Sequence, residues 1–359
     1  MRVNVSGSWW QTDALGSVPK ATLQPSEIEA IRLLEEWNRG REEFTFITSG
    51  STGAPKAMSF RRHQLEASAK MSIQALGLKS GMTALACLDT RYVAGAMMVV
   101  RTAVAKMHLI IRNPSSNPLK DLDWTVDFLA VAPLQIAALL DESLGQLNKT
   151  AVVIVGGGPI PNSMIPRLQR VAPACFATYG MTETLTHVAL RRLNGKRPQT
   201  SFHLLPTVSA HADDRGCLVI EAPHLGPKPI ETNDLVEWTK DGGFRVMGRI
   251  DSVINSGGIK VQPARVERAV EQVLTKLSIA RRYFVAGVPD ERLYESVVLV
   301  TEGLPFTITQ EEELKKLLAS KLGKFEMPRL LLYCPRFVET ATQKIDRIAT
   351  LDSVRGKTP

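Results

Sequence analysis

The sequence predicts an α/β protein with a mixed or parallel sheet, followed by a smaller α+β unit. Up to about residue 180, short β-rich runs alternate with helical segments, which is the pattern of parallel βα units. From Gly216 the runs become typical of antiparallel strands, and after "GRID" (248–251) a short α+β pattern follows. We therefore expect two domains, residues 1–250 and 251–359, with the boundary near Asp251.

The first domain is expected to hold six short strands with helices between them. The expected strands are residues 44–48, 83–88, 108–112, 127–132, 151–155 and 174–178. Apolar residues spaced three to four apart predict helices over 61–76, 133–141 and 161–171. The last two begin at a proline, which the first turn of a helix tolerates.

The second half is expected to begin with antiparallel strands in "GCLVIEAP" (216–223) and "DLVEWTKDGGFRVMG" (234–248), with "KDGG" as a hairpin turn. Helices are predicted over 266–277 and 310–322, the second capped by Thr309. Strands are predicted over 282–288, 296–301 and 330–333. The two ends, residues 1–8 and 355–359, are expected to fray.

The amino-acid composition excludes some classes of protein but does not identify the function. The 359 residues carry a formal net charge of +8, yet the basic residues are spread along the chain, so a nucleic-acid-binding protein has only its charge in favour. A positive surface also suits small polyanions such as nucleotides. The four cysteines lack paired spacing, which predicts a cytoplasmic protein without a disulfide framework or zinc site. The apolar stretch 92–111 is interrupted by Arg101 and Lys106, so no membrane span is expected.

The stretch "TFITSGSTGAPKAMSF" (45–60) predicts a phosphate-binding loop. Its glycines allow backbone amides to converge, hydroxyls add donors, and a lysine adds positive charge. It is not a Walker loop, because Pro55 stands where that pattern requires glycine. A plain surface turn is the alternative, and the position directly after a strand favours phosphate binding. The residues expected to bind phosphate are Thr48, Ser49, Gly50, Ser51, Thr52, Gly53 and Lys56.

That loop resembles the phosphate loop of the adenylate-forming superfamily, which contains acyl-CoA synthetases. Further segments similar to this superfamily follow in order: "VGGGPIP" (155–161), "ATYGMTET" (177–184), "TNDLVEW" (232–238), "GRIDSVINSGGIKVQPARVE" (248–267) and "TATQKIDR" (340–347). Asn233 and Gln343 replace glycines of the pattern, and Tyr92 replaces a histidine. Because the loop comes so early, the resemblance implies a first domain that lacks most of the usual N-terminal subdomain, and a small mobile C-terminal domain.

The resemblance implies a ligase that uses ATP, Mg²⁺ and coenzyme A on a small-molecule carboxylate. Such a carboxylate is already ionised at neutral pH, so catalysis needs positioning and neutralisation of charge between two anions. The implied catalytic residues are Lys344, which would bridge carboxylate and α-phosphate, Glu183, which would hold Mg²⁺, and Thr182. A solvated lysine and an exposed helix-start glutamate are the alternatives.

The resemblance also assigns the nucleotide and coenzyme A sites. Tyr179 would stack on adenine opposite Gly157, Gly158 and Pro159, with Gly180 and Met181 in the same segment, although core packing would also explain the tyrosine.

Asp234 would accept hydrogen bonds from the ribose hydroxyls, and Arg249 would reach ribose or phosphate. Asp251 would be the hinge about which the second domain turns. Gly257, Gly258 and Lys260 would line the path of the pantetheine arm, or form a plain tight turn.

For the acid, three residues are candidates. Arg91 could grip a second carboxylate, Tyr92 stands at the substrate-pocket position, and His187 could reach the same group. A surface arginine and a core histidine are equally good readings. "NPSSNPL" (113–119), "VAPLQ" (131–135) and "YGMTETLTH" (179–187) are similar to compact 2-succinylbenzoate–CoA ligases.

Other activities remain open on the sequence. The chain could load another aryl or fatty acid, transfer it to a carrier protein, or bind a nucleotide without catalysis. The oligomeric state, a homodimer included, is also open.

Overall fold

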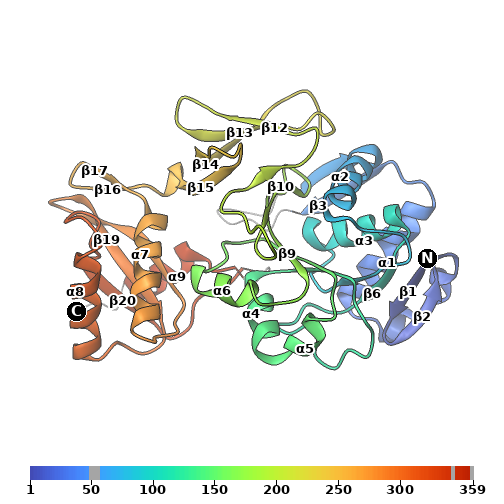
Figure 1. Cartoon of the computed structure of the whole chain (residues 1–359), viewed down its shortest axis with the longest axis horizontal. Helices are drawn as coiled ribbons and strands as arrows, with labels where there is room; N and C mark the ends of the chain where they lie inside the picture. The colour runs from blue at the N-terminus through green and yellow to red at the C-terminus, as the bar shows by residue number, and fades with distance from the viewer. Residues whose placement is uncertain (48–56, 341–343, 356–359) are drawn as a thin grey trace. The chain divides into compact units, whose positions relative to one another are not determined.

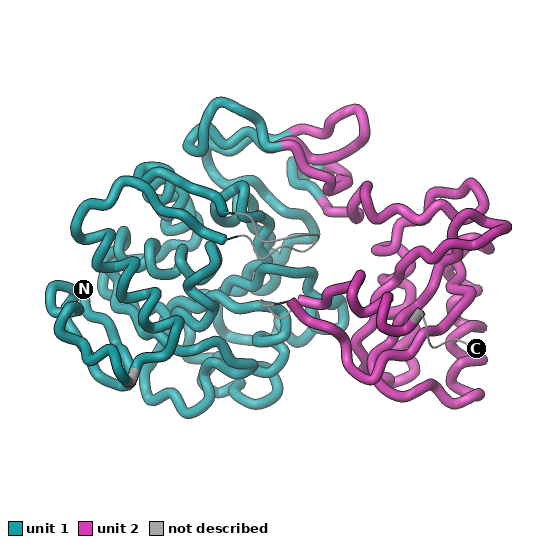
Figure 2. Tube along the Cα trace, turned by 180° about the vertical axis from the view of Figure 1, so that it is seen from behind, with its two compact units in different colours: residues 1–210, 220–230, 239–244 teal, residues 211–219, 231–238, 245–359 magenta. Residues whose placement is uncertain are grey.

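The computed structural model describes residues 1–47, 57–340 and 344–355 (Figure 1). The chain divides into two compact units, coloured separately in Figure 2. Unit 1 contains residues 1–210, 220–230 and 239–244, and unit 2 contains residues 211–219, 231–238 and 245–359. The boundary at residue 251 stays a prediction. In the described part of the chain, no helix is both long and apolar enough to cross a bilayer.

A nine-stranded sheet forms the centre of unit 1 and confirms the α/β class. Its strand order is β11-β10-β9-β8-β7-β5-β6-β1-β2, and the middle strands β6, β5, β7, β8 and β9 pair in parallel. The short apolar runs of β5, β6, β7 and β8 are buried on both faces, as expected for a parallel sheet covered by helices, whereas β9 alternates between buried and half-buried residues. The bounds are β5 Thr83–Ala86, β6 His108–Ile111, β7 Phe128–Val131, β8 Val152–Val155 and β9 Ala174–Gly180.

Both edges of this sheet end in antiparallel strands. β1 (Arg2–Val5) pairs in parallel with β6 and turns at Ser6 and Gly7 into β2 (Ser8–Gln11). The expectation that residues 1–8 fray is therefore wrong, because Val3 and Val5 are buried against the sheet. At the other edge, β10 (His187–Arg192) and β11 (His203–Leu204) add antiparallel to β9.

Six α-helices are described in unit 1. They are α1 Pro25–Asn38, α2 Arg62–Leu76, α3 Val93–Ala105, α4 Pro133–Glu142, α5 Leu144–Leu147 and α6 Ile165–Leu168. α3 packs against α1, α2, β5 and β6. The helix expected over 161–171 is shorter: a 3₁₀ turn at Asn162–Met164 precedes α6, which begins again just before Pro166. Proline fits only the first turn of a helix, so it divides the segment.

Two smaller sheets also involve unit 1 residues. β3 (Glu43–Ile47) and β4 (Ala57–Arg61) form an antiparallel pair. A four-stranded sheet has the order β12-β13-β14-β15, with bounds Ser209–Ala212, Cys217–Glu221, Ile230–Trp238 and Phe244–Arg249. The hairpin turn predicted at "KDGG" is confirmed, since Thr239 N donates to Gly243 O at 2.8 Å and Gly242 has a φ of 78°.

Most of unit 2 is a small α+β fold. Its elements are β16 Ile254–Ser256, β17 Ile259–Val261, α7 Pro263–Lys276, β18 Tyr283–Asp290, β19 Tyr294–Glu302, α8 Ile308–Ala319, β20 Leu330–Cys334 and α9 Arg347–Arg355. Alternate residues of the sheet face two cores: Val285 and Leu299 join the α7–α8 side, whereas Phe284 and Val298 join the α9 side. The cap of α8 is Thr307 rather than Thr309, because Thr307 Oγ1 accepts from Gln310 N at 3.2 Å.

Candidate active site

In unit 1, the predicted adenine-binding residues lie where neighbouring parallel strands end. Val155, the last residue of β8, pairs with Ala177 of β9, so the segment Gly157–Gly158–Pro159 and the residue Tyr179 both leave the same edge of the sheet. Gly157, Gly158 and Pro159 are exposed. The carboxyl edge of a parallel sheet is the usual place for a nucleotide in such folds.

An aromatic cluster holds the Tyr179 ring. Its centroid lies 5.3 Å from that of Phe244 and 5.9 Å from that of Phe202, and Phe244 is completely buried. The guanidinium of Arg191 lies 5.3 Å from the Phe202 centroid. Local sequence patterns do not predict these three supporting residues, because they come from other segments of the chain than Tyr179. The cluster orients the tyrosine and leaves it half-buried.

A tight turn follows Tyr179 and carries Met181, Thr182 and Glu183. Gly180 pairs with His187, and a side chain at Gly180 would collide with the backbone of Thr186 and His187. Thr184 Oγ1 accepts from Met181 N at 2.9 Å and lies 2.7 Å from Thr186 O. Leu185 is held in the left-handed region at φ 63° while fully buried. Such a conformation costs a branched residue free energy, so the surrounding contacts must hold the turn.

The chemistry of Glu183 fits a magnesium ion. Its carboxylate is exposed and makes no hydrogen bond or ion pair with another described residue. Among the described residues, no group of three or more His, Cys, Asp or Glu could hold a metal by itself. Mg²⁺ is commonly held by one or two carboxylates together with the phosphates of a nucleotide, so a single free carboxylate suits it.

His187 lies in the interior, against α2. Its Nε2 is 3.1 Å from Ser72 Oγ and its Nδ1 is 3.4 Å from Thr186 Oγ1. Burial, together with the charge of Arg101, holds the pKa of His187 well below its usual value. The structure thus places this residue as a hydrogen-bonded core histidine, and a contact with substrate stays a prediction.

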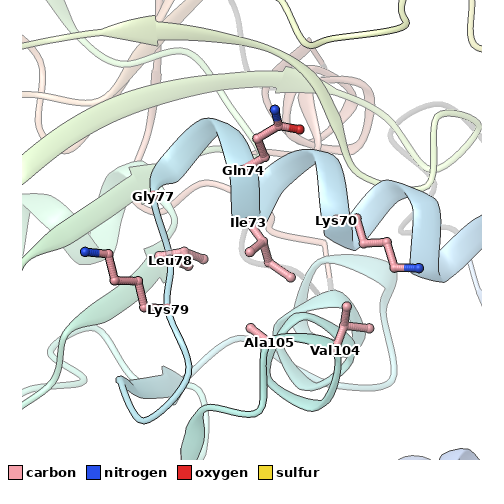
Figure 3. Close-up of a pocket in the computed structure, with 8 residues that line it drawn as sticks. All are labelled: Lys70, Ile73, Gln74, Gly77, Leu78, Lys79, Val104 and Ala105. Atoms are coloured by element: carbon pink, nitrogen blue, oxygen red, sulfur yellow. The ribbon is translucent and has the colours of Figure 1, made fainter.

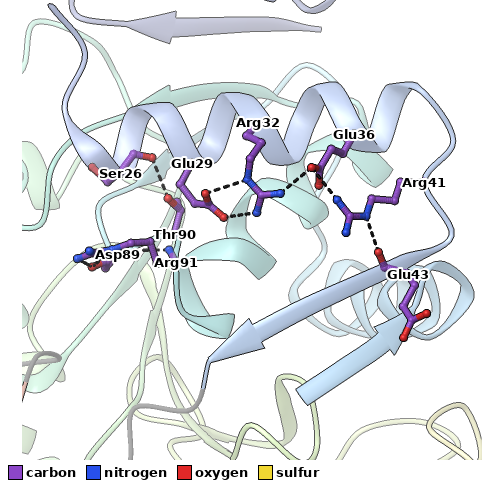
Figure 4. A network of polar contacts seen from close by, with 9 residues as sticks. All are labelled: Ser26, Glu29, Arg32, Glu36, Arg41, Glu43, Asp89, Thr90 and Arg91. Carbon is purple, nitrogen blue, oxygen red and sulfur yellow. Dashed lines mark hydrogen bonds and ion pairs between the residues drawn. The ribbon is translucent and has the colours of Figure 1, made fainter. Parts of the chain in front are cut away.

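Arg91 lies on the surface beside the segment that precedes α3. Its guanidinium donates to both carboxylate oxygens of Asp89, from Nε at 3.0 and 3.1 Å and from Nη2 at 2.6 Å (Figure 4). In spite of this pairing, 59% of the Arg91 side chain remains exposed. The buried arginine of this apolar region is Arg101, at 2% exposure. Tyr92, the residue before α3, is half-buried and pairs with Ile47. A role for Arg91 in binding the acid stays a prediction.

In unit 2, the predicted ribose-binding residues form one charged cluster. Arg249 lies 3.6 Å from Asp234 and makes a two-pronged contact with Asp251. Asn233 Nδ2 donates to the same Asp251 carboxylate at 3.1 Å. These hydrogen bonds, chiefly the one from Arg249, lower the pKa of Asp251. The asparagine that replaces a glycine of the resemblance therefore contacts the predicted hinge residue.

The glycine turn and the catalytic-lysine segment complete unit 2. Gly257 and Gly258 join β16 to β17 with φ values of 60° and 83°, which a two-residue hairpin requires. Lys260 is exposed on β17. Lys344 is exposed in part, its backbone NH donates to Thr340 Oγ1 at 3.2 Å, and desolvation by the surrounding chain lowers its pKa. The predicted phosphate-binding residues Thr48, Ser49, Gly50, Ser51, Thr52, Gly53 and Lys56 lie outside the described residues.

A hollow of about 350 Å³ lies between α2 and α3. Ile73 of α2 points toward Val104 and Ala105 of α3, and Lys70 and Lys79 stand on either side (Figure 3). None of the described residues predicted for the active site lines this hollow.

Comparisons with known proteins agree with this geometry. Residues 37–222 match the model of the family described as AMP-binding enzyme. A "probable 2-succinylbenzoate--CoA ligase" of Mycobacterium tuberculosis is 28% identical, over 96% of this chain and 92% of the relative.

Solved structures give the same result for the fold. An AMP-forming acyl-CoA synthetase/AMP-acid ligase II-like protein from Dyadobacter fermentans is 34% identical, with a TM-score of 0.63, over 96% of this chain and 98% of that chain. The O-succinylbenzoate coenzyme A synthetase of Bacillus subtilis, in complex with ATP and magnesium ion, has a TM-score of 0.74 at 20% identity. The match covers 86% of this chain and 69% of that chain.

Proposed function

The chain belongs to the family of AMP-binding enzymes, and from this premise we propose that it is an ATP-dependent acid–CoA ligase acting through an acyl-adenylate. The observation that carries the proposal is the edge of the unit 1 sheet. There the aromatic support of Tyr179, the exposed glycines after β8 and the free carboxylate of Glu183 belong to two neighbouring strands and their loops. This arrangement offers a stacking surface for a base beside a ligand for a phosphate-bound cation.

In the first half-reaction, a carboxylate oxygen of the acid attacks the α-phosphorus of ATP and diphosphate leaves. Tyr179 orients the adenine, Asp234 and Arg249 hold the ribose, and Lys344 offsets the repulsion between carboxylate and α-phosphate. Mg²⁺ held by Glu183 would neutralise charge on the phosphates. In the second half-reaction, the thiol sulfur of coenzyme A attacks the acyl carbon, the thiol proton is lost, and AMP leaves. Gly257 and Gly258 leave room for the pantetheine arm.

The acid proposed is 2-succinylbenzoate. Support comes from curated relatives of that name, at 22–28% identity in Listeria, Mycobacterium and Bacillus among others. Arg91, with its exposed guanidinium near the start of α3, could meet the second carboxylate of this acid. A different aryl or fatty acid is the second candidate, since the pairing of Arg91 with Asp89 already satisfies its charge.

The test is carboxylate-dependent diphosphate release by the full chain, measured with and without coenzyme A over a panel of acids. Diphosphate release with 2-succinylbenzoate, and thioester formation when coenzyme A is added, is the expected result. Turnover with other acids alone would favour the second candidate. Absence of turnover with every acid, in protein that still binds ATP by calorimetry, would contradict ligase activity.

A further inference from the structure

Arg101 is a buried cation without an acidic partner. Its side chain is 2% exposed, and no described carboxylate lies within ion-pair distance. Nη1 lies 3.7 Å from the sulfur of Met98, Nη2 donates to Thr186 Oγ1, and Nε has no partner among the described residues. Burial lowers the pKa of Arg101 to about 10, so the group is still charged at neutral pH. A charge buried without an ion-pair partner destabilises a fold unless hydrogen bonds offset the cost.

The contact with Thr186 begins a directed chain of hydrogen bonds. A guanidinium can only donate, so Thr186 Oγ1 accepts from Arg101, and the same oxygen lies 3.4 Å from Nδ1 of His187. Nε2 of His187 carries a proton and donates to Ser72 Oγ at 3.1 Å, because the only hydroxyl hydrogen of Ser72 is used in the next bond. Ser72 Oγ in turn donates to Ser68 O at 3.2 Å. The chain runs from α3 through Thr186 and His187 to α2, and it requires a proton on Nε2 of His187.

This chain is attached to the end of the turn that carries Glu183. The turn contains Leu185 at φ 63°, and Gly180 packs against Thr186 too closely to accept a side chain. Thr184 forms hydrogen bonds within the turn, whereas Thr186 accepts a hydrogen bond from Arg101 of α3. α3 also begins directly after Tyr92, the predicted substrate-pocket residue. One helix therefore contacts both the acid segment and the nucleotide turn.

We propose that Arg101 is a positioning residue which, through Thr186, holds the Gly180–His187 turn so that Glu183 and Thr182 are presented to the metal-bound nucleotide. This inference rests on the proposed function for its consequence in catalysis, but the positioning itself is a property of the free protein. The buried positive charge is retained because the turn is strained and requires an anchor that the low-dielectric interior makes strong.

The first experiment is hydrogen–deuterium exchange of the peptide spanning residues 177–190 in the ligand-free full chain. Arg101→Met keeps the apolar volume and removes a buried charge, so global stability should be unchanged or higher. Exchange at the turn should nevertheless be about tenfold faster. Thr186→Val should act in the same way, and Thr186→Ser, which keeps the hydroxyl, should restore slow exchange. Thr102→Val is the control, because its buried hydroxyl bonds only within α3, to Met98 O at 2.7 Å.

The second experiment measures Mg·ATP binding by calorimetry and the KM values for Mg·ATP and for the acid. Loss of a group that orients a metal ligand commonly weakens metal binding about 10–100-fold. Arg101→Met and Thr186→Val should weaken Mg·ATP binding by such a factor and leave the KM of the acid nearly unchanged. In addition, ¹⁵N NMR should find the Nε2–H form of His187 in the wild type, and a mixture of neutral forms in Arg101→Met.

Three results would overturn the positioning role: unchanged exchange in Arg101→Met, unchanged exchange in Thr186→Val, or equally fast exchange in Thr102→Val. A wild-type chain without diphosphate release would contradict the proposed function alone, because the exchange comparison does not depend on turnover.

Discussion

The ring of Tyr179 meets the ring of Phe244 edge to face, with centroids 5.3 Å apart and planes at 86°. We expect Phe244→Ala to destabilise unit 1 by about 3–5 kcal/mol and to weaken ATP binding, because Tyr179 loses the wall that orients it. Denaturant unfolding and calorimetry measure the two effects. Phe284→Ala is the control, since this fully buried ring of unit 2 packs on Phe337 instead. Similar losses of ATP affinity in both variants would argue against a specific role for the Tyr179–Phe244 contact.

Lys344→Ala should lower the rate of acyl-adenylate formation at least about a hundredfold, because the charge that offsets two anions is lost. Thioester formation from supplied acyl-adenylate should remain largely intact. Single-turnover kinetics of each half-reaction provide the measurement. Lys315→Ala, which removes an exposed lysine paired with Glu311, should change neither step. Equal loss of both half-reactions in Lys344→Ala would contradict a role confined to adenylation.

Arg91→Ala should raise the KM for 2-succinylbenzoate about tenfold and leave the KM for ATP unchanged. The reason is the loss of a charge-assisted hydrogen bond to the second carboxylate. Steady-state kinetics with both substrates varied give the answer. Arg39→Ala is the matched control, because this exposed arginine directly after α1 has its guanidinium 3.6 Å from Glu35. If the KM for the acid does not change, Arg91 is a surface residue paired with Asp89 and nothing more.

The stability of the chain should depend on His187 at mildly acidic pH. Its pKa is lowered in the folded state, so the unfolded state binds the proton first and stability is lost as pH falls below about 6.5. This one group contributes a slope of about 1.4 kcal/mol per pH unit between the unfolded and folded pKa values. Urea unfolding from pH 7.5 to pH 5 should show a shallower slope for His187→Gln than for the wild type. Parallel slopes would mean that His187 titrates alike in both states.

The parallel strands could be predicted because each is a short apolar run buried on both faces. Residues 83–86, 108–111 and 152–155 lie inside the predicted ranges for this reason. α1 could have been predicted too: Ala30, Ile31, Leu34 and Trp37 recur at helical spacing and are buried. The β1–β2 hairpin could not, because its order depends on pairing with β6 about a hundred residues later.

The candidate site shows the same division. The segment "YGMTET" contains its functional residues within six positions, and so Tyr179 and Glu183 could be predicted from the sequence. Arg91 and Arg101 lie in one apolar region of the sequence, and the sequence does not show which of the two side chains is buried. The structure buries Arg101 and exposes Arg91. Phe202 and Phe244 reach Tyr179 through tertiary contacts, for which no local spacing exists.

The hairpin Arg2–Gln11 has a practical consequence for handling the protein. It covers the outer edge of β6, whose backbone groups would otherwise be unpaired and could form hydrogen bonds with a strand of another chain. Deleting the first eleven residues, or fusing a bulky tag that displaces them, would therefore expose this edge and promote self-association.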